Sequence, residues 1–176
     1  MIMTPIISKE LVQAIRDQFK INWHGIHGFS HLARVWENGL RLAPITGASE
    51  RVVQLFALFH DSRRLSDGKD PGHGPRGAML AELWRGRYFE LVDTEFELLC
   101  TACRLHTTAL THPEPTVQTC FDADRLDLAR VGKTPNPALL CTEAARDLET
   151  IRWAVERSLS GFQPDLFAHH RSEPTK

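Results

Sequence analysis

Residues 55–61 have the sequence LFALFHD, an apolar run that ends abruptly in His60 and Asp61. A neutral imidazole and a carboxylate are costly to bury unless a partner compensates them. A metal ion compensates both, because each side chain offers a lone pair to the same cation. The pair alone is common in proteins. A metal site therefore requires further nitrogen and oxygen ligands at inward-facing positions elsewhere in the chain.

Around this stretch, single Gly and Pro residues divide the chain into segments with the apolar period of helices. Ser30 is a candidate N-cap for the second helix and Pro44 a candidate stop. Residues 62–74 are polar and rich in Gly, Pro and Asp, which predicts a loop. No segment alternates apolar and polar residues as a strand would. The prediction is an all-α fold, a compact core of about six to eight helices, over residues 8–21, 30–43, 50–61, 75–84, 94–106, 116–131 and 142–159.

Length and composition describe an ordinary globular protein. Of the 176 residues, 42% are hydrophobic and 24% charged, as in typical soluble proteins. A chain of this length can bury a substantial core. We expect one domain over residues 1–160 and a loosely ordered C-terminal tail over residues 161–176, which lack periodicity. The net charge of −1 gives no reason to expect binding to nucleic-acid polymers. No apolar run approaches the roughly 18 residues of a membrane span, and residues 1–20 lack the core of a signal peptide, so we expect a cytoplasmic protein without membrane contacts.

The four cysteines, Cys100, Cys103, Cys120 and Cys141, are few for this length. Cys100 and Cys103 form a CxxC pattern, but a structural zinc site usually needs a second ligand pair at similar spacing, and the sequence has none. Both residues also share one helical face with apolar neighbours. The sequence therefore predicts core packing for them and no disulfide framework.

Several polar side chains fall on predicted apolar faces when helices are drawn at about 100° per residue. His31 lies at the edge of an apolar stripe with Arg34 one turn further along, and His60 belongs to a helix with almost no polar face. Asp124 sits in the middle of an apolar face, whereas Asp122 falls on another side of the same helix. Because a carboxylate on an apolar face needs a strong partner, we expect Asp124 to point inward and Asp122 outward.

Each of these residues also has an ordinary structural interpretation. A single histidine beside an apolar stripe is more often a core residue than a ligand, and a single buried aspartate is often a helix cap or a salt-bridge partner. For Asp122 and Asp127 we prefer that interpretation, with Arg125 and Arg130 as partners. The ordinary interpretation is harder to apply to two imidazoles and two carboxylates that occur together on three helices. Such a set suits a divalent ion such as Mg, Mn, Fe, Ni or Co. These candidate ligands are His31, His60, Asp61 and Asp124.

This pattern resembles the signature of the HD-domain metal-dependent phosphohydrolase superfamily, which has one histidine, then a His-Asp pair, then a distant aspartate, all on helices. Residues 27–35, HGFSHLARV, resemble the family's first motif, with His31 as the ligand. The pair formed by His60 and Asp61 matches the pair that names the superfamily. Residues 122–127, DADRLD, resemble the closing motif and again select Asp124. The resemblance covers roughly residues 23–131 and implies a helical core with a metal bound by these four side chains.

Two further histidines, His73 and His106, lie where some members of the superfamily add ligands. Those members hold two metals, and they include the HD-GYP cyclic dinucleotide phosphodiesterases and the mixed-valent iron oxygenases of this fold. In such a site Asp61 would bridge the ions. The GYP motif is absent, and SRR at residues 62–64 follows the pair where HD-GYP proteins have a lysine, so we do not expect cyclic dinucleotide cleavage. The resemblance leaves one metal or two open, and with one metal His73 and His106 would face the substrate.

The function implied by the resemblance is hydrolysis of a small phosphorylated metabolite, such as a nucleotide, by a phosphomonoesterase or phosphodiesterase. A water molecule activated by the divalent ion would attack phosphorus. The candidate catalytic residues are Asp61, His73 and His106, the two histidines as general acids to the leaving oxygen if they are not ligands.

Three arginines are candidate substrate-binding residues. Arg34, Arg63 and Arg64 could each clamp phosphate, because guanidinium matches phosphate oxygens two at a time. For Arg63 and Arg64 the alternative is a solvated surface position. Substrate specificity is expected to come from the loops at residues 62–74 and 107–115.

Two other functions fit the same residues. An oxygenase with two irons requires all six ligands, including His73 and His106, and iron in the purified protein. A non-catalytic domain that binds a nucleotide or a partner protein would be expected to have lost at least one ligand, whereas this set is intact. A homodimer contact could be formed by Trp84, Tyr88 and Phe89, which ordinary core packing explains equally well.

Overall fold

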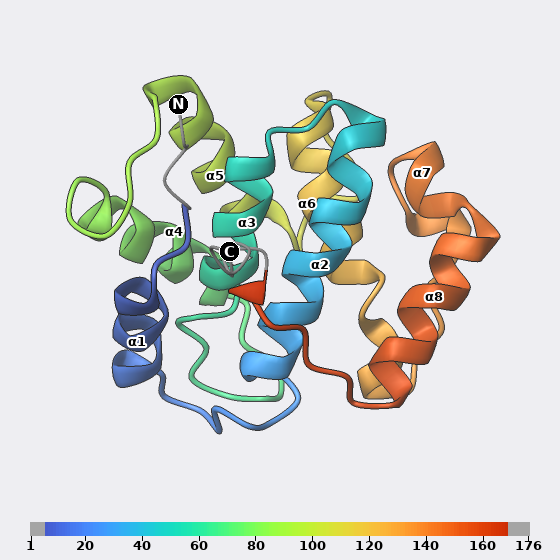
Figure 1. Ribbon diagram of the computed structural model, residues 1–176, viewed down its shortest axis with the longest axis horizontal. Coiled ribbons are helices and arrows are strands. Elements are labelled where there is room, and N and C mark those ends of the chain that lie inside the picture. Colours follow the sequence, from blue (N-terminus) through green and yellow to red (C-terminus); the bar gives the residue numbers. More distant parts are fainter. Residues whose placement is uncertain (1–5, 169–176) are drawn as a thin grey trace, which may run out of the picture.

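The computed structural model describes residues 6–168, and within this range the chain forms eight α-helices and two short 3-10 helices (Figure 1). The described residues contain no β-strand, only an isolated bridge between Arg85 and Phe89. The prediction of an all-α fold is confirmed. The helices are α1 (Lys9–Gln18), α2 (Phe29–Thr46), α3 (Glu50–Phe59), α4 (His73–Trp84), α5 (Asp93–Leu105), α6 (Pro115–Arg125), η1 (Leu128–Val131), η2 (Pro137–Leu139), α7 (Glu143–Arg146) and α8 (Leu148–Leu159).

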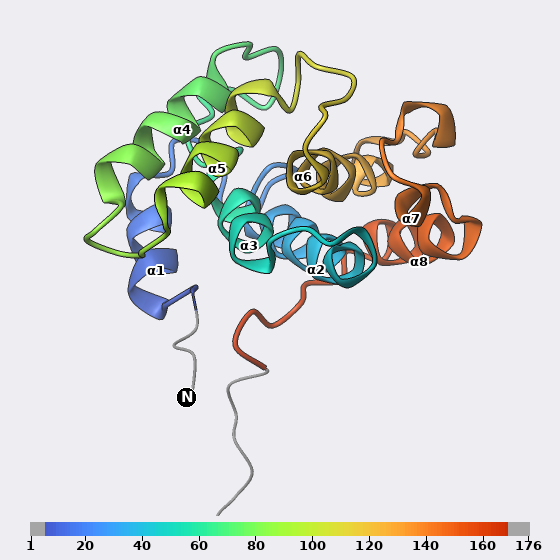
Figure 2. The same cartoon turned by 90° about the horizontal axis from the view of Figure 1, so that it is seen from above.

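Helix α2 is at the centre of the arrangement. It packs against α3 and α6, and these two helices also contact each other. Helices α4 and α5 form a pair beside α3, and α7 and α8 lie on the opposite side of α2 (Figure 2). A main hydrophobic core is formed by residues of α1 to α6, and a smaller cluster of buried apolar residues joins α7 and α8 to α2 and the end of α6.

The limits of α2 differ from the sequence-based prediction at both ends. Its N-cap is Gly28 rather than Ser30. Pro44 does not stop the helix but lies in its last turn, where a missing backbone N–H removes only one helical hydrogen bond. The helix ends instead at Gly47, whose φ of 74° is the left-handed conformation that favours glycine at this position.

Two long predicted helices are each divided in the structure. The helix expected over residues 116–131 ends at Arg125, and the chain continues as the 3-10 helix η1. The helix expected over residues 142–159 is broken at Asp147, which has non-helical dihedral angles (φ −57°, ψ 128°). The Asp147 side chain accepts a hydrogen bond from the backbone N–H of Thr150 and so caps α8. A side chain that competes for backbone donors in this way interrupts a helix without changing its apolar period.

Part of the expected loose tail packs on the domain. Leu166 is buried in the main core. The carbonyl of Phe162 accepts a hydrogen bond from Arg34 Nη1 (3.0 Å), and Gln163 Oε1 accepts one from Ser30 Oγ (2.8 Å). Residues 169–176, the rest of the expected tail, lie outside the described residues.

The aromatic residues proposed as a homodimer contact mainly belong to the core. Trp84 and Phe89 are buried, and both rings pack against Phe59, with centroid distances of 6.2 and 5.4 Å. Tyr88 is partly buried against the same cluster. Core packing therefore explains these residues.

The cysteines also behave as predicted. All four are free in the structure, and Cys100, Cys103 and Cys120 are buried in the main core. Burial raises the pKa of the Cys100 thiol to about 11 and also raises the pKa of Cys103, as expected for thiols packed in a core.

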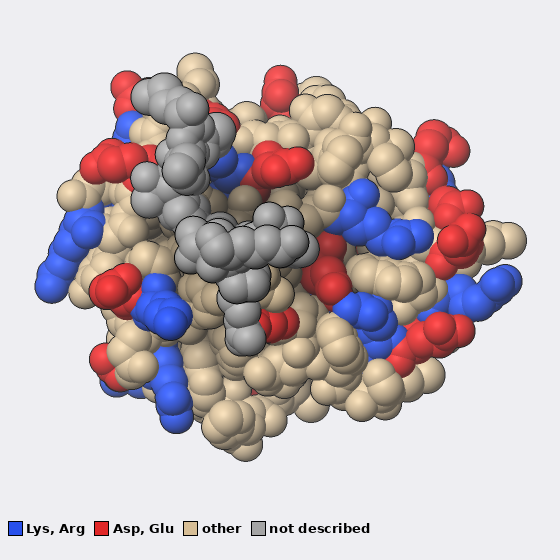
Figure 3. Space-filling view, viewed as in Figure 1, with Lys and Arg blue, Asp and Glu red and all other residues tan. Residues whose placement is uncertain are grey.

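The visible surface carries mixed charge. Lys and Arg side chains alternate with Asp and Glu side chains over the face shown in Figure 3. Among the helices that the structure describes, none combines the length and the apolar character needed to cross a membrane.

Candidate metal centre

The polar cluster lies at the end of the bundle where the beginning of α2 meets the ends of α3, α5 and α6. His60 and Asp61 directly follow α3, a helix whose residues are apolar and mostly buried. His60 has no exposed surface and Asp61 is 3% exposed. The apolar run of residues 55–59 therefore carries these two polar side chains into the interior, where they need partners.

The first group of potential ligands consists of His31, His60 and Asp124, from three helical segments. The Nε2 atoms of His31 and His60 are 3.1 Å apart. Asp124 Oδ1 lies 3.4 Å from His31 Nε2 and 3.7 Å from His60 Nε2. These three ligand atoms lie within 4.8 Å of one another, close enough to surround one cation.

A second group consists of Asp61, His73 and His106, whose ligand atoms also lie within 4.8 Å of one another. His73 Nε2 lies 2.9 Å from His106 Nε2 and 3.1 Å from Asp61 Oδ1. The other oxygen of Asp61, Oδ2, lies 3.5 Å from His31 Nε2 and 3.7 Å from His60 Nε2. Asp61 thus faces both groups, one oxygen toward each. This is the geometry of a carboxylate that could bridge two ions.

The four histidines of the two groups all direct Nε2 into the cluster. His60 Nδ1 contacts the carbonyl oxygens of Phe56 and Ala57 (3.1 Å each), and His106 Nδ1 contacts that of Cys103 (2.8 Å). His73 Nδ1 and His31 Nδ1 likewise meet a backbone carbonyl and a carboxylate. A carbonyl or carboxylate oxygen only accepts, so each Nδ1 carries the hydrogen. In the neutral ring the lone pair is then on Nε2, the atom that faces the cluster.

Helix α4 can bring His73 into this cluster because it lies very close to its neighbours. A Cβ atom at Gly74 would lie 2.3 Å from the carbonyl oxygen of Cys103, and a Cβ at Gly77 would lie 2.3 Å from that of Phe59. Any side chain at either position would push α4 away. The two glycines, three residues apart and following His73, are the signal in the sequence for this close approach.

The electrostatics favour ionised carboxylates in the cluster. Burial alone would raise the pKa of Asp61, but the charge of His60 and hydrogen bonds from the other histidines outweigh it and hold that pKa well below its ordinary range. Burial also opposes ionisation of Asp124, and hydrogen bonding and charge from His60, followed by the charge of His31, again lower its pKa. Both carboxylates are therefore in the form that binds a metal.

Asp127 holds His31 in place from behind. Its Oδ2 accepts a hydrogen bond from His31 Nδ1 (2.8 Å), and Arg34 donates to both of its oxygens (2.6 and 3.1 Å). Arg130, the partner expected from the sequence, is further away at 3.7 Å. Arg34 also donates to the carbonyl of Phe162 and is only 5% exposed, so each of its three nitrogens has a partner inside the protein. These contacts favour a positioning role for Arg34 over the expected contact with substrate, because Arg34 fixes the carboxylate that orients a potential ligand.

Of the two arginines after the His-Asp pair, Arg64 is the one at the cluster. It is 8% exposed, and its Nη1 lies 3.3 Å from Asp61 Oδ1 and 3.2 Å from His73 Nε2. The rest of its guanidinium donates to the carbonyls of Ser66 and Gly68 (3.1 and 2.8 Å). The loop after α3 therefore holds a permanent positive charge against the second group of ligands.

Arg63 extends in another direction. Its Nη1 donates to Gln18 Oε1 on α1 (3.2 Å), and its side chain lines a surface hollow together with Met79 and Leu83 of α4. This placement does not favour the expected contact of Arg63 with substrate. Arg63 instead joins α1 to the loop that carries Arg64.

The expectation that Asp122 points outward is wrong. Asp122 has no exposed surface, and its carboxylate accepts three hydrogen bonds: from the backbone N–H of Cys141 (2.7 Å), and from the N–H and hydroxyl of Thr142 (2.8 Å each). Burial raises the pKa of Asp122. A helical wheel of α6 could not reveal this, because the residues that cover Asp122 come from a later segment. Arg125, its expected partner, donates to backbone carbonyls instead.

Comparison with known proteins gave a structural match. No protein-family model matches the chain, and no curated protein sequence matches it significantly. Among solved structures it is similar to the 1.45 Å crystal structure of a predicted HD superfamily hydrolase from an uncultured Thermotogales bacterium. The two are 27% identical over 86% of this chain and 87% of the other, with a TM-score of 0.64.

The arrangement of helices and the buried histidine–aspartate cluster therefore define an HD-domain fold, and the resemblance found in the sequence is confirmed. The donor set fits divalent metal ions, since six nitrogen and oxygen ligand atoms lie in two close groups, with the histidine lone pairs directed inward.

Proposed function

We propose that this protein is a divalent-metal-dependent phosphohydrolase that acts on a small phosphorylated metabolite, such as a nucleotide. The observation that carries the proposal is the convergence of four histidine Nε2 atoms on two ionised carboxylates. Lone pairs about 3 Å apart repel unless a cation or a proton lies between them. The likeness to a predicted HD superfamily hydrolase supports hydrolysis as the reaction class.

Within this proposal, His31, His60, Asp61 and Asp124 hold the first ion. His73 and His106, together with the second oxygen of Asp61, are placed to hold another. A bound divalent ion would supply a water acidic enough to attack phosphorus near neutral pH and would neutralise charge on the phosphoryl oxygens. If only one ion binds, His73 and His106 remain free to donate a proton to the leaving oxygen.

Arg64 is the proposed phosphate contact. Its Nη1 lies 3.3 Å from Asp61 Oδ1, so a phosphoryl group at the ligand cluster is within its reach. Two backbone carbonyls hold the guanidinium in position in addition to its ion pair with Asp61. Arg64 can therefore donate to a phosphoryl oxygen through Nη1, the nitrogen that now lies against Asp61.

A second candidate function is an oxygenase with two irons, and one observation favours it: all six ligands that it requires lie together. The same six ligands also suit a two-metal hydrolase. Metal identity and reactivity decide between these functions, because the ligand set is common to both.

Metal analysis of protein purified without added metal tests both functions. Activity toward phosphate esters with Mn, Ni, Mg or Co supports the phosphohydrolase. Two equivalents of iron, an oxygen-sensitive spectrum and no phosphatase activity would replace it with the oxygenase. No metal after incubation with several divalent ions would leave a non-catalytic binding domain. Asp124→Ala provides the control, since it removes a ligand and should abolish metal retention and hydrolysis together.

A further inference from the structure

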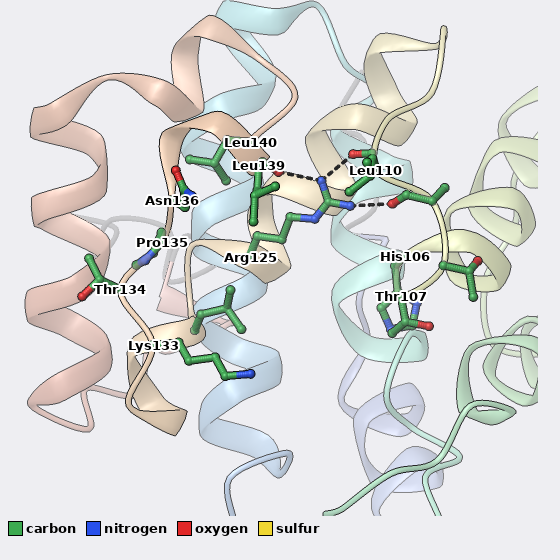
Figure 4. Close-up of a pocket in the computed structure, with 13 residues that line it drawn as sticks. His106, Thr107, Leu110, Arg125, Lys133, Thr134, Pro135, Asn136, Leu139 and Leu140 are labelled. Atoms are coloured by element: carbon green, nitrogen blue, oxygen red, sulfur yellow. Dashed lines mark hydrogen bonds between the residues drawn. The ribbon is translucent and has the colours of Figure 1, made fainter.

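A cavity of about 340 Å³ lies between the segment that follows α5 and the segment that precedes α7 (Figure 4). His106, a ligand of the second group, forms part of its wall. The other walls come from residues 107–110, which follow α5, and from residues 133–140, which connect η1 to the segment before α7. The volume is within the range of sites that bind small molecules. A group held in this cavity would therefore lie against His106, the residue of the second group that lines it.

The rim of the cavity is apolar and exposed. Leu110 and Leu139 are 73% and 53% exposed, and they lie on the two sides of the Arg125 guanidinium (Figure 4). Single exposed leucines are normal, but two on the rim of one cavity form an apolar patch that a ligand would cover. Leu128 and Pro135 also line it. The cavity therefore suits the carbon skeleton of a ligand.

Arg125 holds the two walls at a fixed separation. Its guanidinium donates to the carbonyls of Ala109 and Leu110 (2.7 Å each) on one side and of Leu139 (2.9 Å) on the other. These bonds join two loops that are distant in the sequence. A cavity that is braced in this way is already formed before a ligand enters, which lowers the entropic cost of binding.

The charge on the cavity is positive. None of the described residues that line it carries a carboxylate. The Arg125 guanidinium donates to three backbone carbonyls, whereas Lys133 is exposed, and its ammonium group points to the side of the cavity on which His106 lies (Figure 4). An amine at the edge of an apolar cavity favours a ligand with an anionic group.

We propose that this cavity binds the organic part of the phosphorylated substrate, an apolar group with a further anionic substituent, and that Lys133 recognises that anion. The inference rests on the proposed function, since it assumes that the phosphoryl group is held at the metal cluster next to His106. It assigns substrate specificity to the loops at residues 107–110 and 133–140.

Three phosphonates, which cannot be hydrolysed at the P–C bond by this chemistry, test the apolar part of the proposal. The affinity of Mn²⁺-loaded protein for methylphosphonate, phenylphosphonate and 4-carboxyphenylphosphonate is measured by calorimetry. Phenylphosphonate should bind about tenfold more tightly than methylphosphonate, because the ring leaves water. Leu139→Ala should reduce that preference. Leu83→Ala on α4, which removes an even more exposed leucine (74%) outside the cavity, should leave the preference unchanged.

Recognition of the anionic substituent by Lys133 is tested by the ratio of the affinities for 4-carboxyphenylphosphonate and phenylphosphonate. We expect the wild-type protein to prefer the carboxylate by roughly fivefold, and Lys133→Met to lose that preference. Lys9→Met, at an exposed position on α1, provides the matched control. A preference that survives Lys133→Met, or equal binding of all three phosphonates, would overturn the inference.

Failure of the inference and failure of the proposed function give different results. If phosphate esters are hydrolysed but the three phosphonates bind equally, the function stands and the cavity is not the substrate site. If phosphate esters are not hydrolysed but the phosphonates are discriminated as expected, the cavity binds such ligands and the proposed reaction is wrong. If phosphate esters are not hydrolysed and the metal-loaded protein binds none of the phosphonates, both are wrong.

Discussion

Asp127 offers the sharpest test of how the metal centre is held. Asp127→Asn keeps the size of the side chain but removes the charge that His31 Nδ1 and Arg34 Nε meet at 2.8 and 2.6 Å. We expect the affinity for Mn²⁺ to fall by about 10- to 100-fold, the usual effect of losing the hydrogen-bond partner of a ligating histidine. Because the Arg34 guanidinium then stays buried without its counter-charge, the free energy of unfolding should fall by about 3 kcal/mol. For a chain of 176 residues, that loss lowers Tm by about 6–12 °C.

Calorimetric titration with Mn²⁺ and thermal unfolding of the metal-free protein measure these two effects separately. Asp122→Asn is the matched control, since Asp122 is an equally buried carboxylate on α6 with hydrogen bonds to Cys141 and Thr142. An amide cannot accept all of these bonds, so the control should also unfold at a lower temperature, while its Mn²⁺ affinity stays close to that of the wild type. Wild-type affinity in Asp127→Asn would refute the reasoning. An equal loss in both variants would show that affinity follows stability rather than the orientation of His31.

Three further perturbations address single parts of the site. Asp124→Ala should leave no metal after dialysis, measured by elemental analysis, because it removes one of three ligands in the first group; metal retained at the wild-type level would exclude Asp124 as a ligand. Arg64→Ala should weaken competitive inhibition by inorganic phosphate about tenfold, whereas Arg63→Ala should change it little, and equal effects would place the phosphate contact elsewhere. Asp70 accepts a hydrogen bond from Arg76 Nη2 (2.6 Å), and although burial opposes ionisation, this contact holds the pKa of Asp70 below its ordinary 3.8. Its contribution to stability is present above about pH 4 and is lost as the pH falls through the folded-state pKa. The stability difference between wild type and Asp70→Asn in urea unfolding should therefore be smaller at about pH 3 than at about pH 7, and a difference independent of pH would contradict this.

The parts of the site that follow from local periodicity could be predicted from the sequence. His60 and Asp61 end an apolar helix, so their burial follows from α3 alone. Asp124 lies on the apolar face of α6, and its place in the cluster also follows from one helix. His31 needed the family resemblance, because a histidine at the edge of a stripe could equally be an ordinary core residue.

The parts that depend on distant segments could not be predicted in this way. Asp122 is buried by residues 141 and 142, and the wheel of α6 contains no information about them. The chemistry of guanidinium suggests that Arg34 contacts phosphate, but in the fold Arg34 pairs with the carboxylate of Asp127. Both cases have the same physical origin. A charged side chain binds the nearest opposite charge or donor, and which group is nearest is decided by tertiary packing.

The convergence of the histidines has a consequence for the stability of the protein as well as for its chemistry. His31 and His60 bring their Nε2 atoms to 3.1 Å, and His73 and His106 bring theirs to 2.9 Å, in a part of the fold with almost no exposed surface. Each pair needs a proton or a cation between its lone pairs, and backbone carbonyls or Asp127 prevent the rings from turning away. Cores built for stability alone avoid such local conflict. We therefore expect a divalent ion to stabilise this arrangement of four histidines and two carboxylates, and metal binding to release protons and raise Tm together.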